Sequence, residues 1–290
     1  MTSGVRLTDI AILVLLIVCQ SASARSLLQS TPLFVPAGLD SCTIYVPSGC
    51  TLNTEAAPRA NACSQNNSDQ LTSVVTAADN DQGVKIAFYG DSITKLWRDR
   101  DGHGQSLIYK QYFGNFSAAV LGVGGDQTSN LWWRLLHGQI FTKHAPQVTV
   151  MLIGTNDLGT ASCGVGEPGI IAAVPGVFNR TDSMVRLLKD NNPRTVVILV
   201  GVLPRGDNKV GSIYPTPNKY TQSIKDLNAR LYQYAAEEPF VVFVDCTEQM
   251  LLNGTIDDSV FTDGLHPTEI EGMGRLANCI SFEITSRVTL

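Results

Sequence analysis

The sequence predicts a three-layer α/β/α domain, in which a five-stranded parallel sheet lies between two layers of helices. Five short apolar runs alternate with helical patterns along the last two-thirds of the chain. The runs lack the polar alternation of a strand with one face in water, so they are typical of strands covered on both faces. Strands that alternate with helices form parallel sheets, which gives the predicted class.

Each element follows from its own pattern. The predicted strands are residues 84–89, 118–121, 148–153, 195–200 and 240–244. The predicted helices, with apolar side chains three and four residues apart, are 128–137, 177–189, 218–236 and 269–284. Together they indicate a flavodoxin-like arrangement, in which ligands bind at the loops that follow the carboxyl ends of the strands.

Composition excludes several classes of protein. The chain has 290 residues, of which 44% are apolar and 16% charged, so it can bury a large core. Its net charge is −5 and no run of Lys or Arg occurs. We therefore expect neither nucleic acid nor an anionic membrane as a partner. The sequence leaves the oligomeric state open.

Residues 1–24 have the pattern of a signal peptide. Arg6 precedes an apolar run at 10–19, and small residues at 22 and 24 match a signal-peptidase site. The run is shorter than the roughly 20 residues needed to cross a bilayer, so we expect secretion without membrane insertion after cleavage. Residues 25–82 hold three cysteines and little periodicity, which predicts an irregular extension before a folded domain at 83–290.

The cysteines and glycosylation motifs agree with secretion. If Cys19 leaves with the signal peptide, six cysteines remain, and an even count in an oxidising compartment predicts complete pairing. The sequence does not choose among the pairings, although Cys246 with Cys279 would join the last strand to the last helix. Glycosylation motifs begin at Asn66, Asn115, Asn179 and Asn253.

Polar, glycine-rich clusters follow the predicted strands. They are residues 90–94 (Gly-Asp-Ser-Ile-Thr), 122–126 (Gly-Val-Gly-Gly-Asp), 154–157 (Gly-Thr-Asn-Asp) and 263–267 (Asp-Gly-Leu-His-Pro). Acyl transfer needs a nucleophile, a base, an orienting carboxylate and donors for an oxyanion, and these clusters offer all four. Each cluster alone is also compatible with an ordinary turn or helix cap. Their joint occurrence, each in a strand-end loop, favours chemistry.

Other sites are less well supported. The glycine loop at 122–125 lacks the third glycine of a dinucleotide fingerprint, because Gln127 stands there. The acidic segment 79–83 lacks the closing carboxylate of a calcium loop, since position 90 is Gly. No Cys-x-x-Cys motif suggests zinc. We therefore expect no metal and no cofactor, and we interpret His103, His137 and His144 as outside the site, the last two on the surface.

The four clusters, in this order, resemble those of the SGNH hydrolase superfamily, also called GDSL esterases, over about residues 84–285. Segments 122–128, 132–135 and 203–206 resemble its platelet-activating-factor acetylhydrolase branch. The resemblance implies the SGNH fold, with Ser92 as nucleophile, His266 as base and Asp263 as the carboxylate that orients it. It also implies an oxyanion hole made of the Ser92 and Gly125 N–H groups and the Asn156 amide.

The residues fit these implied roles. Asp263 and His266 are close enough in sequence to pair, and Gly125 lets backbone approach an acyl group. A nucleophile elbow of the α/β-hydrolase type is excluded, because no Gly-x-Ser-x-Gly surrounds Ser92. The expected function is a secreted serine esterase, with extracellular glycans as a candidate substrate.

The segments that flank the site point to short acyl groups, acetyl above all. Residues 96–111, 158–176 and 205–219 are expected to be polar loops without an apolar helical stripe that could cover a long acyl chain. Two other functions stay open: a lysophospholipid or lipid acyl hydrolase, and a non-catalytic carbohydrate-binding or cell-wall protein on the same fold.

Overall fold

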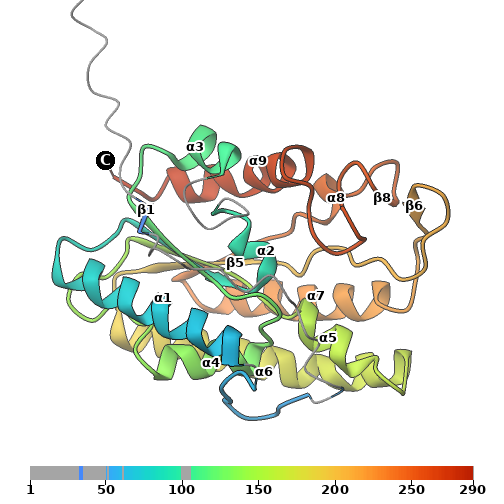
Figure 1. The fold of residues 1–290 in the computed structure, drawn as a ribbon, viewed down its shortest axis with the longest axis horizontal. Coiled ribbons are helices and arrows are strands. Elements are labelled where there is room, and N and C mark those ends of the chain that lie inside the picture. The colour runs from blue at the N-terminus through green and yellow to red at the C-terminus, as the bar shows by residue number, and fades with distance from the viewer. Residues whose placement is uncertain (1–32, 35–49, 51, 61, 99–105, 290) are drawn as a thin grey trace, which may run out of the picture.

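The computed structural model describes residues 33–34, 50, 52–60, 62–98 and 106–289. A parallel sheet crosses the middle of the molecule in the order β1-β3-β2-β4-β5-β7 (Figure 1). Its strands are β1 (Leu33–Phe34), β2 (Ile86–Gly90), β3 (Ala118–Gly122), β4 (Val148–Leu152), β5 (Val196–Val200) and β7 (Val241–Val244). A separate antiparallel pair consists of β6 (Ile213–Tyr214) and β8 (Ile256–Asp257).

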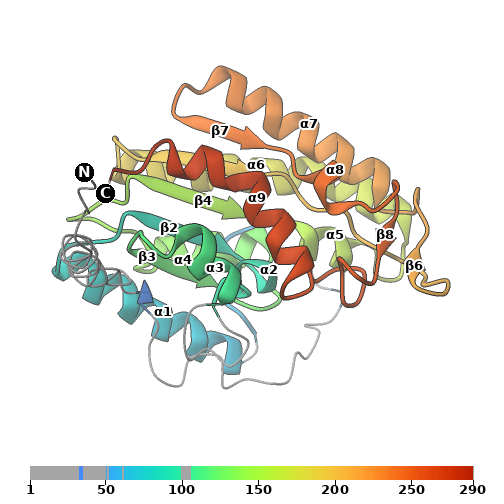
Figure 2. The same ribbon diagram turned by 90° about the horizontal axis from the view of Figure 1, so that it is seen from above.

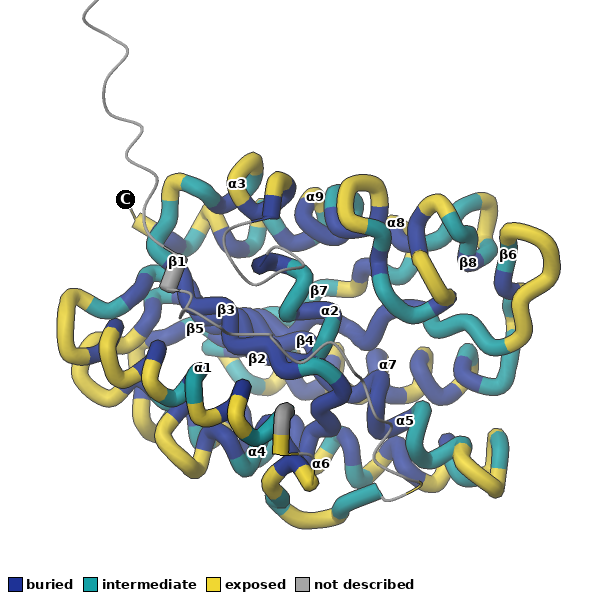
Figure 3. Tube along the Cα trace, viewed as in Figure 1, coloured by how far each residue is buried: buried dark blue, intermediate teal, exposed yellow. Residues whose placement is uncertain are grey.

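The five predicted strands are confirmed, and the structure adds β1 as a short sixth strand. β1 pairs in parallel with β3, so it lies at the edge of the sheet. Every residue of β2, β3 and β4 is buried, as the dark central strands of Figure 3 show. Burial on both faces explains why the runs are apolar without alternation.

Helices cover both faces of the sheet (Figure 1). One face carries α1 (Ala62–Asn80), α4 (Thr128–Leu136), α5 (Thr155–Ala161), α6 (Glu167–Asn191) and α7 (Thr221–Glu237). The other carries α2 (Ser92–Lys95), α3 (Leu107–Phe113), α8 (Thr247–Met250) and α9 (Glu271–Thr285). Each layer packs its own apolar cluster against the sheet. The predicted three-layer α/β/α class is therefore confirmed.

Two sequence-based expectations about secondary structure are wrong. Residues 62–80 form α1, although the whole of 25–82 was expected to be irregular. Its Leu71, Val74 and Ala78 are buried at helical spacing, but the polar residues around them conceal the stripe. The three segments that flank the site are expected to be loops, yet 158–176 contains the end of α5 and the start of α6. Likewise, 96–111 contains the start of α3, and 205–219 contains β6. Pro175 and the glycines near it favour a loop, so the predicted helix begins only at residue 177. The structure accommodates Pro175 inside α6.

Two disulfides join distant parts of the described chain. Cys246 pairs with Cys279, as the sequence suggested, and Cys50 pairs with Cys163. Cys42, and with it the remaining pairing, lies outside the described residues. The four asparagines of the glycosylation motifs are all exposed: Asn66, Asn115, Asn179 and Asn253. Among the helices that the structure describes, none is both long and apolar enough to cross a membrane.

Candidate active site

Ser92 begins α2, directly after the carboxyl end of β2. The turn between them is tight. A Cβ on Gly90 would lie 2.1 Å from Thr94 Oγ1 and 2.2 Å from the Leu152 carbonyl, so only glycine fits there. The Asp91 carboxylate caps the turn by accepting the Ile93 N–H at 2.9 Å. The fold therefore holds the Ser92 hydroxyl at the edge of the sheet where the strand-end loops meet.

His266 approaches Ser92 from the loop that precedes α9. Its Nε2 lies 2.8 Å from Ser92 Oγ, and its Nδ1 lies 2.8 Å from Asp263 Oδ2. The other Asp263 oxygen accepts the backbone N–H groups of Leu265 and His266 at 3.0 and 2.8 Å. The structure thus brings three predicted residues, 174 positions apart at the extremes, into one hydrogen-bonded chain.

The ionisation of Asp263 follows from these contacts. Partial burial acts to raise the pKa of the Asp263 carboxyl, but the hydrogen bonds from the His266 side chain and backbone outweigh it. The pKa is held well below its ordinary value. Asp263 is therefore an anion at neutral pH, and it favours the His266 tautomer with a proton on Nδ1 and a bare Nε2 facing Ser92.

Gly125 lies in the loop after β3, and Asn156 lies in the first turn of α5, which follows β4; β3 and β4 are the two strands that flank β2. Seen from above, the strand arrows point to the end where α2, α5 and the start of α9 gather (Figure 2). Both residues are buried. The Asn156 side chain donates one N–H to the Asp126 carbonyl at 3.0 Å, which links the two loops. A side-chain amide has two N–H groups, so the second remains for a ligand.

Buried ion pairs lie behind these loops. Arg134 Nε donates to Asp126 at 2.8 Å and Arg180 Nη2 donates to Asp157 at 3.0 Å. Burial raises the pKa of the Asp126 carboxyl, and the positive charge of Arg134 works against that rise. Asp157 also accepts the backbone N–H and hydroxyl of Thr128 at 2.9 and 2.6 Å. These contacts join α4, α5 and α6 around the loops.

Sequence reasoning missed the two arginines of these ion pairs. Arg134 occupies the apolar stripe of α4 beside Leu131 and Leu135, and Arg180 occupies that of α6. A charge on the buried face of a helix needs a partner, and that signal could have identified both. Of the other histidines, His137 and His144 are exposed as expected, and His103 lies outside the described residues.

Comparison with known proteins decides the family. The sequence profile of the GDSL-like lipase/acylhydrolase family matches residues 88–270. The chain belongs to that family. The match runs from the middle of β2 to the residue before α9 and includes Ser92, Gly125, Asn156, Asp263 and His266. Membership makes the chain a carboxylic ester hydrolase, and the resemblance to the SGNH superfamily is confirmed.

Relatives within the family include platelet-activating factor acetylhydrolases. The human IB subunit alpha1 is 28% identical over 188 residues, which cover 64% of this chain and 69% of the relative. The chicken subunit alpha2 is 28% identical over 189 residues, covering 65% and 71%. The family branch inferred from the motifs is therefore also confirmed.

Solved structures share the fold. A putative acylhydrolase from Bacteroides fragilis has a TM-score of 0.54 and 25% identity, covering 72% of this chain and 92% of that one. An acetylxylan esterase from Geobacillus stearothermophilus has a TM-score of 0.53 and 20% identity, covering 70% and 94%.

Proposed function

We propose that the protein is a secreted serine esterase that hydrolyses short-acyl esters, acetyl esters above all, at Ser92. The hydrogen-bonded chain from Ser92 through His266 to Asp263 carries this proposal. A serine hydroxyl is a weak nucleophile until a base removes its proton, and an imidazole at 2.8 Å from Oγ is within reach to do so.

The reaction proceeds through a covalent acyl-enzyme. His266 Nε2 takes the Ser92 proton while Oγ attacks the ester carbonyl, and Asp263 stabilises the imidazolium that forms. The imidazolium then protonates the leaving alcohol as the tetrahedral intermediate collapses. Water, activated by the same imidazole, hydrolyses the acyl-enzyme and returns the proton to Ser92.

The oxyanion of the tetrahedral intermediate needs preorganised donors. The N–H groups of Ser92 and Gly125 and the second amide N–H of Asn156 supply them in this proposal. The Asp126 carbonyl fixes the Asn156 amide at 3.0 Å, so the amide does not have to reorient as the charge forms. A neutral amide also avoids the cost of burying another ion.

The names of the relatives support a preference for short acyl groups: the related acetylhydrolases and the acetylxylan esterase act on acetyl esters. A long acyl chain would need a deep apolar groove at the nucleophile, since each buried methylene contributes about 0.8 kcal/mol. O-acetylated extracellular glycans are the substrate we propose.

Secretion is part of the proposal. The signal-peptide pattern at residues 1–24, two disulfides and four exposed glycosylation asparagines support it. Protein recovered from a culture medium should begin at Arg25. An N-terminus that still includes residues 1–24 would contradict cleavage.

The test compares wild type with Ser92→Ala on acetylated xylo-oligosaccharides, p-nitrophenyl esters from acetyl to palmitoyl, and lysophospholipids. Ser92→Ala should lower kcat to below about a thousandth of wild type, with folding retained. For wild type, kcat/KM should be highest for acetyl and butyryl esters. A steady rise toward palmitoyl would instead support the lipid hydrolase. Turnover on no ester, with binding to glycans, would support the carbohydrate-binding protein.

A further inference from the structure

Residues 52–60 form a strap that lies outside the part of the chain matched by the family. In Figure 1 the strap runs beside α4 and α6 before α1 begins. The Ala57 N–H donates to the Ser129 carbonyl at 3.2 Å, and the Asn130 amide donates to the Ala57 carbonyl at 3.0 Å. These bonds fasten the strap to the first turn of α4, directly after the Gly125 loop.

Arg59 is buried, in contrast to the rest of the strap, whose other residues are half-buried or exposed. Its side chain is only 4% exposed. Nη1 donates to the Gly125 carbonyl at 2.7 Å, and Nε lies 3.9 Å from Asp126 Oδ1. Arginine is rarely buried without a partner, so these contacts account for its position.

Arg59 contacts the Gly125 loop, which carries one of the proposed oxyanion donors. Gly125 has φ +76°, a backbone conformation that glycine adopts at little cost. Because glycine can adopt many other backbone conformations equally well, contacts from outside the loop are needed to select this one. The Arg59 guanidinium fixes the carbonyl of Gly125, and the next carbonyl, that of Asp126, fixes the Asn156 amide. Two hydrogen bonds, joined through the peptide unit between Gly125 and Asp126, therefore connect the strap to the Gly125 loop and to α5.

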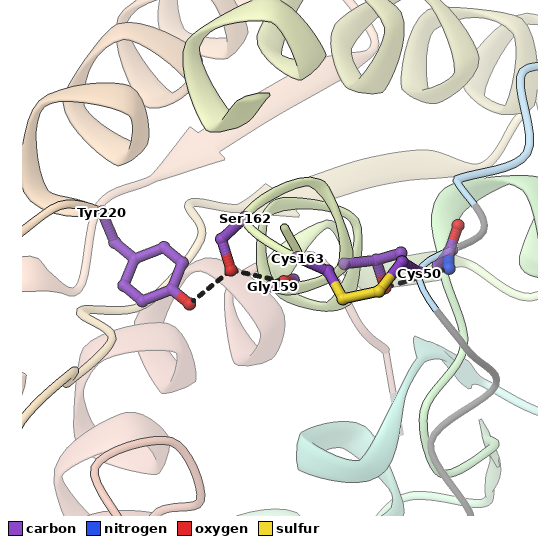
Figure 4. Close-up of a disulfide and its surroundings, with 7 residues drawn as sticks. Cys50, Gly159, Ser162, Cys163 and Tyr220 are labelled. Carbon is purple, nitrogen blue, oxygen red and sulfur yellow. Dashed lines mark hydrogen bonds between the residues drawn. A yellow bond between two sulfur atoms is a disulfide. The ribbon is translucent and has the colours of Figure 1, made fainter. Parts of the chain in front are cut away.

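The Cys50–Cys163 disulfide joins Cys50, two positions before the strap in the sequence, to the turn that follows α5 (Figure 4). That turn is itself fixed, because Ser162 Oγ bonds the Gly159 carbonyl at 2.7 Å and the Tyr220 hydroxyl at 3.1 Å. α5 begins one residue before Asn156. The strap is thus tied covalently to the helix that carries one proposed donor and by Arg59 to the loop that carries the other.

We infer that the strap is a positioning element for the oxyanion hole, with Arg59 as its positioning residue and the Cys50–Cys163 disulfide as its anchor. This inference rests on the proposed function. Arg59 does not touch the substrate. It acts through the Gly125 carbonyl, so its loss should weaken binding of the transition state more than binding of the ester.

The test measures kcat, KM and inhibition by n-butylboronic acid for Arg59→Met. Boronic acids form tetrahedral adducts with a serine hydroxyl, and one adduct oxygen occupies the oxyanion position. We expect kcat to fall about 10-fold to 100-fold, less than for loss of a direct donor, with KM within about threefold. The inhibition constant should rise by the factor by which kcat/KM falls. Arg59→Lys should recover part of the loss, because an ammonium can donate to one carbonyl.

The matched control is Arg230→Met, on the exposed side of α7, which should behave as wild type. An Arg59→Met variant with the kcat and boronate affinity of this control would overturn the inference. Ser92→Ala distinguishes this result from failure of the proposed function: if it retains activity, the function itself is wrong.

The disulfides provide a second test that does not depend on folding of the Arg59 variant. The Cys50→Ser, Cys163→Ser double variant should lower kcat, with KM nearly unchanged. The Cys246→Ser, Cys279→Ser variant loses the second of the two disulfides that the described residues form, which does not touch the strap, and should keep its kcat below its unfolding temperature. Equal kcat in the two double variants would contradict the role of the strap.

Discussion

The Asp263 carboxylate is held by partners within its own loop, whereas the Gly125 loop and the first turn of α5, which carries Asn156, are held from distant parts of the chain. Asp263 is 55% exposed, and its partners lie within three residues of it. Asp126 is fully buried, and its partners Arg59 and Arg134 come from the strap and α4. The comparison implies that a change at Asp263 affects chemistry far more than stability, while changes to the buried ion pairs of Asp126 and Asp157 affect chemistry and stability together.

The largest effect should come from Asp263→Asn. The Asn oxygen can still accept the backbone N–H groups of residues 265 and 266, but the amide favours the wrong tautomer of His266. We expect kcat to fall about 10⁴-fold. The melting temperature should change little, because the side chain is exposed and its bonds are local. If Asp263→Asn lost as much stability as a variant that breaks a buried ion pair, such as Asp157→Ala, the contrast between the two regions would be wrong.

Asp157→Ala tests the buried side. The change leaves the Arg180 guanidinium buried without its carboxylate and removes the acceptor for Thr128. Breaking a buried pair in this way costs about 3–5 kcal/mol, which urea unfolding would measure. The exposed pair of Asp182 with Arg186 is the control, and Asp182→Ala should cost much less. Equal losses would show that the buried pairs do not anchor α5 and α6.

Asn156→Ala, one residue before Asp157 on α5, tests chemistry rather than stability. Because the proposed role of its amide is to bind the oxyanion and not the ground state, we expect kcat to fall about 10²- to 10³-fold while KM changes less. A change confined to KM would place Asn156 in substrate binding.

Counted per pH unit, the smallest effect is the pH dependence that Asp91 produces. Burial raises the pKa of the Asp91 carboxyl to about 7. In the unfolded chain an aspartate loses its proton near pH ~3.9. Between these values the folded state retains a proton that the unfolded state has released, so the free energy of unfolding falls as pH rises, by up to about 1.4 kcal/mol per pH unit. Asp91→Asn should remove that slope. If the free energy of unfolding had the same dependence on pH in wild type and in Asp91→Asn, the raised pKa of Asp91 would be contradicted.

The sequence was most informative where the signal was local. Near-continuous apolar runs located the five long strands within two residues at each end, because burial on both faces leaves a plain pattern. Ser92 and the Asp263–His266 pair were identifiable because each lies in a short polar cluster directly after a strand or before a helix. Those loops gather at one edge of the sheet by topology alone.

The rest depends on contacts between residues distant in sequence. Arg59 is 66 residues from Gly125, and no motif surrounds it. Most residues of α1 are polar, so the sequence alone does not reveal its apolar stripe. The structure shows that the helix buries Leu71, Val74, Val75 and Ala78 against the sheet. α6 begins ten residues before its predicted start, because its glycines and Pro175 indicated a loop. Tertiary packing overrides such local preferences.

The Cys50–Cys163 bond closes a covalent ring, since the two cysteines are 113 residues apart. Ser92, Gly125 and Asn156 all belong to that ring, while Asp263 and His266 lie on the open chain beyond it. A protease that cuts the backbone once between the two cysteines therefore leaves one molecule, in which both fragments remain linked through sulfur. Such a nicked enzyme would migrate as a single species until reduced, and would then separate into two pieces.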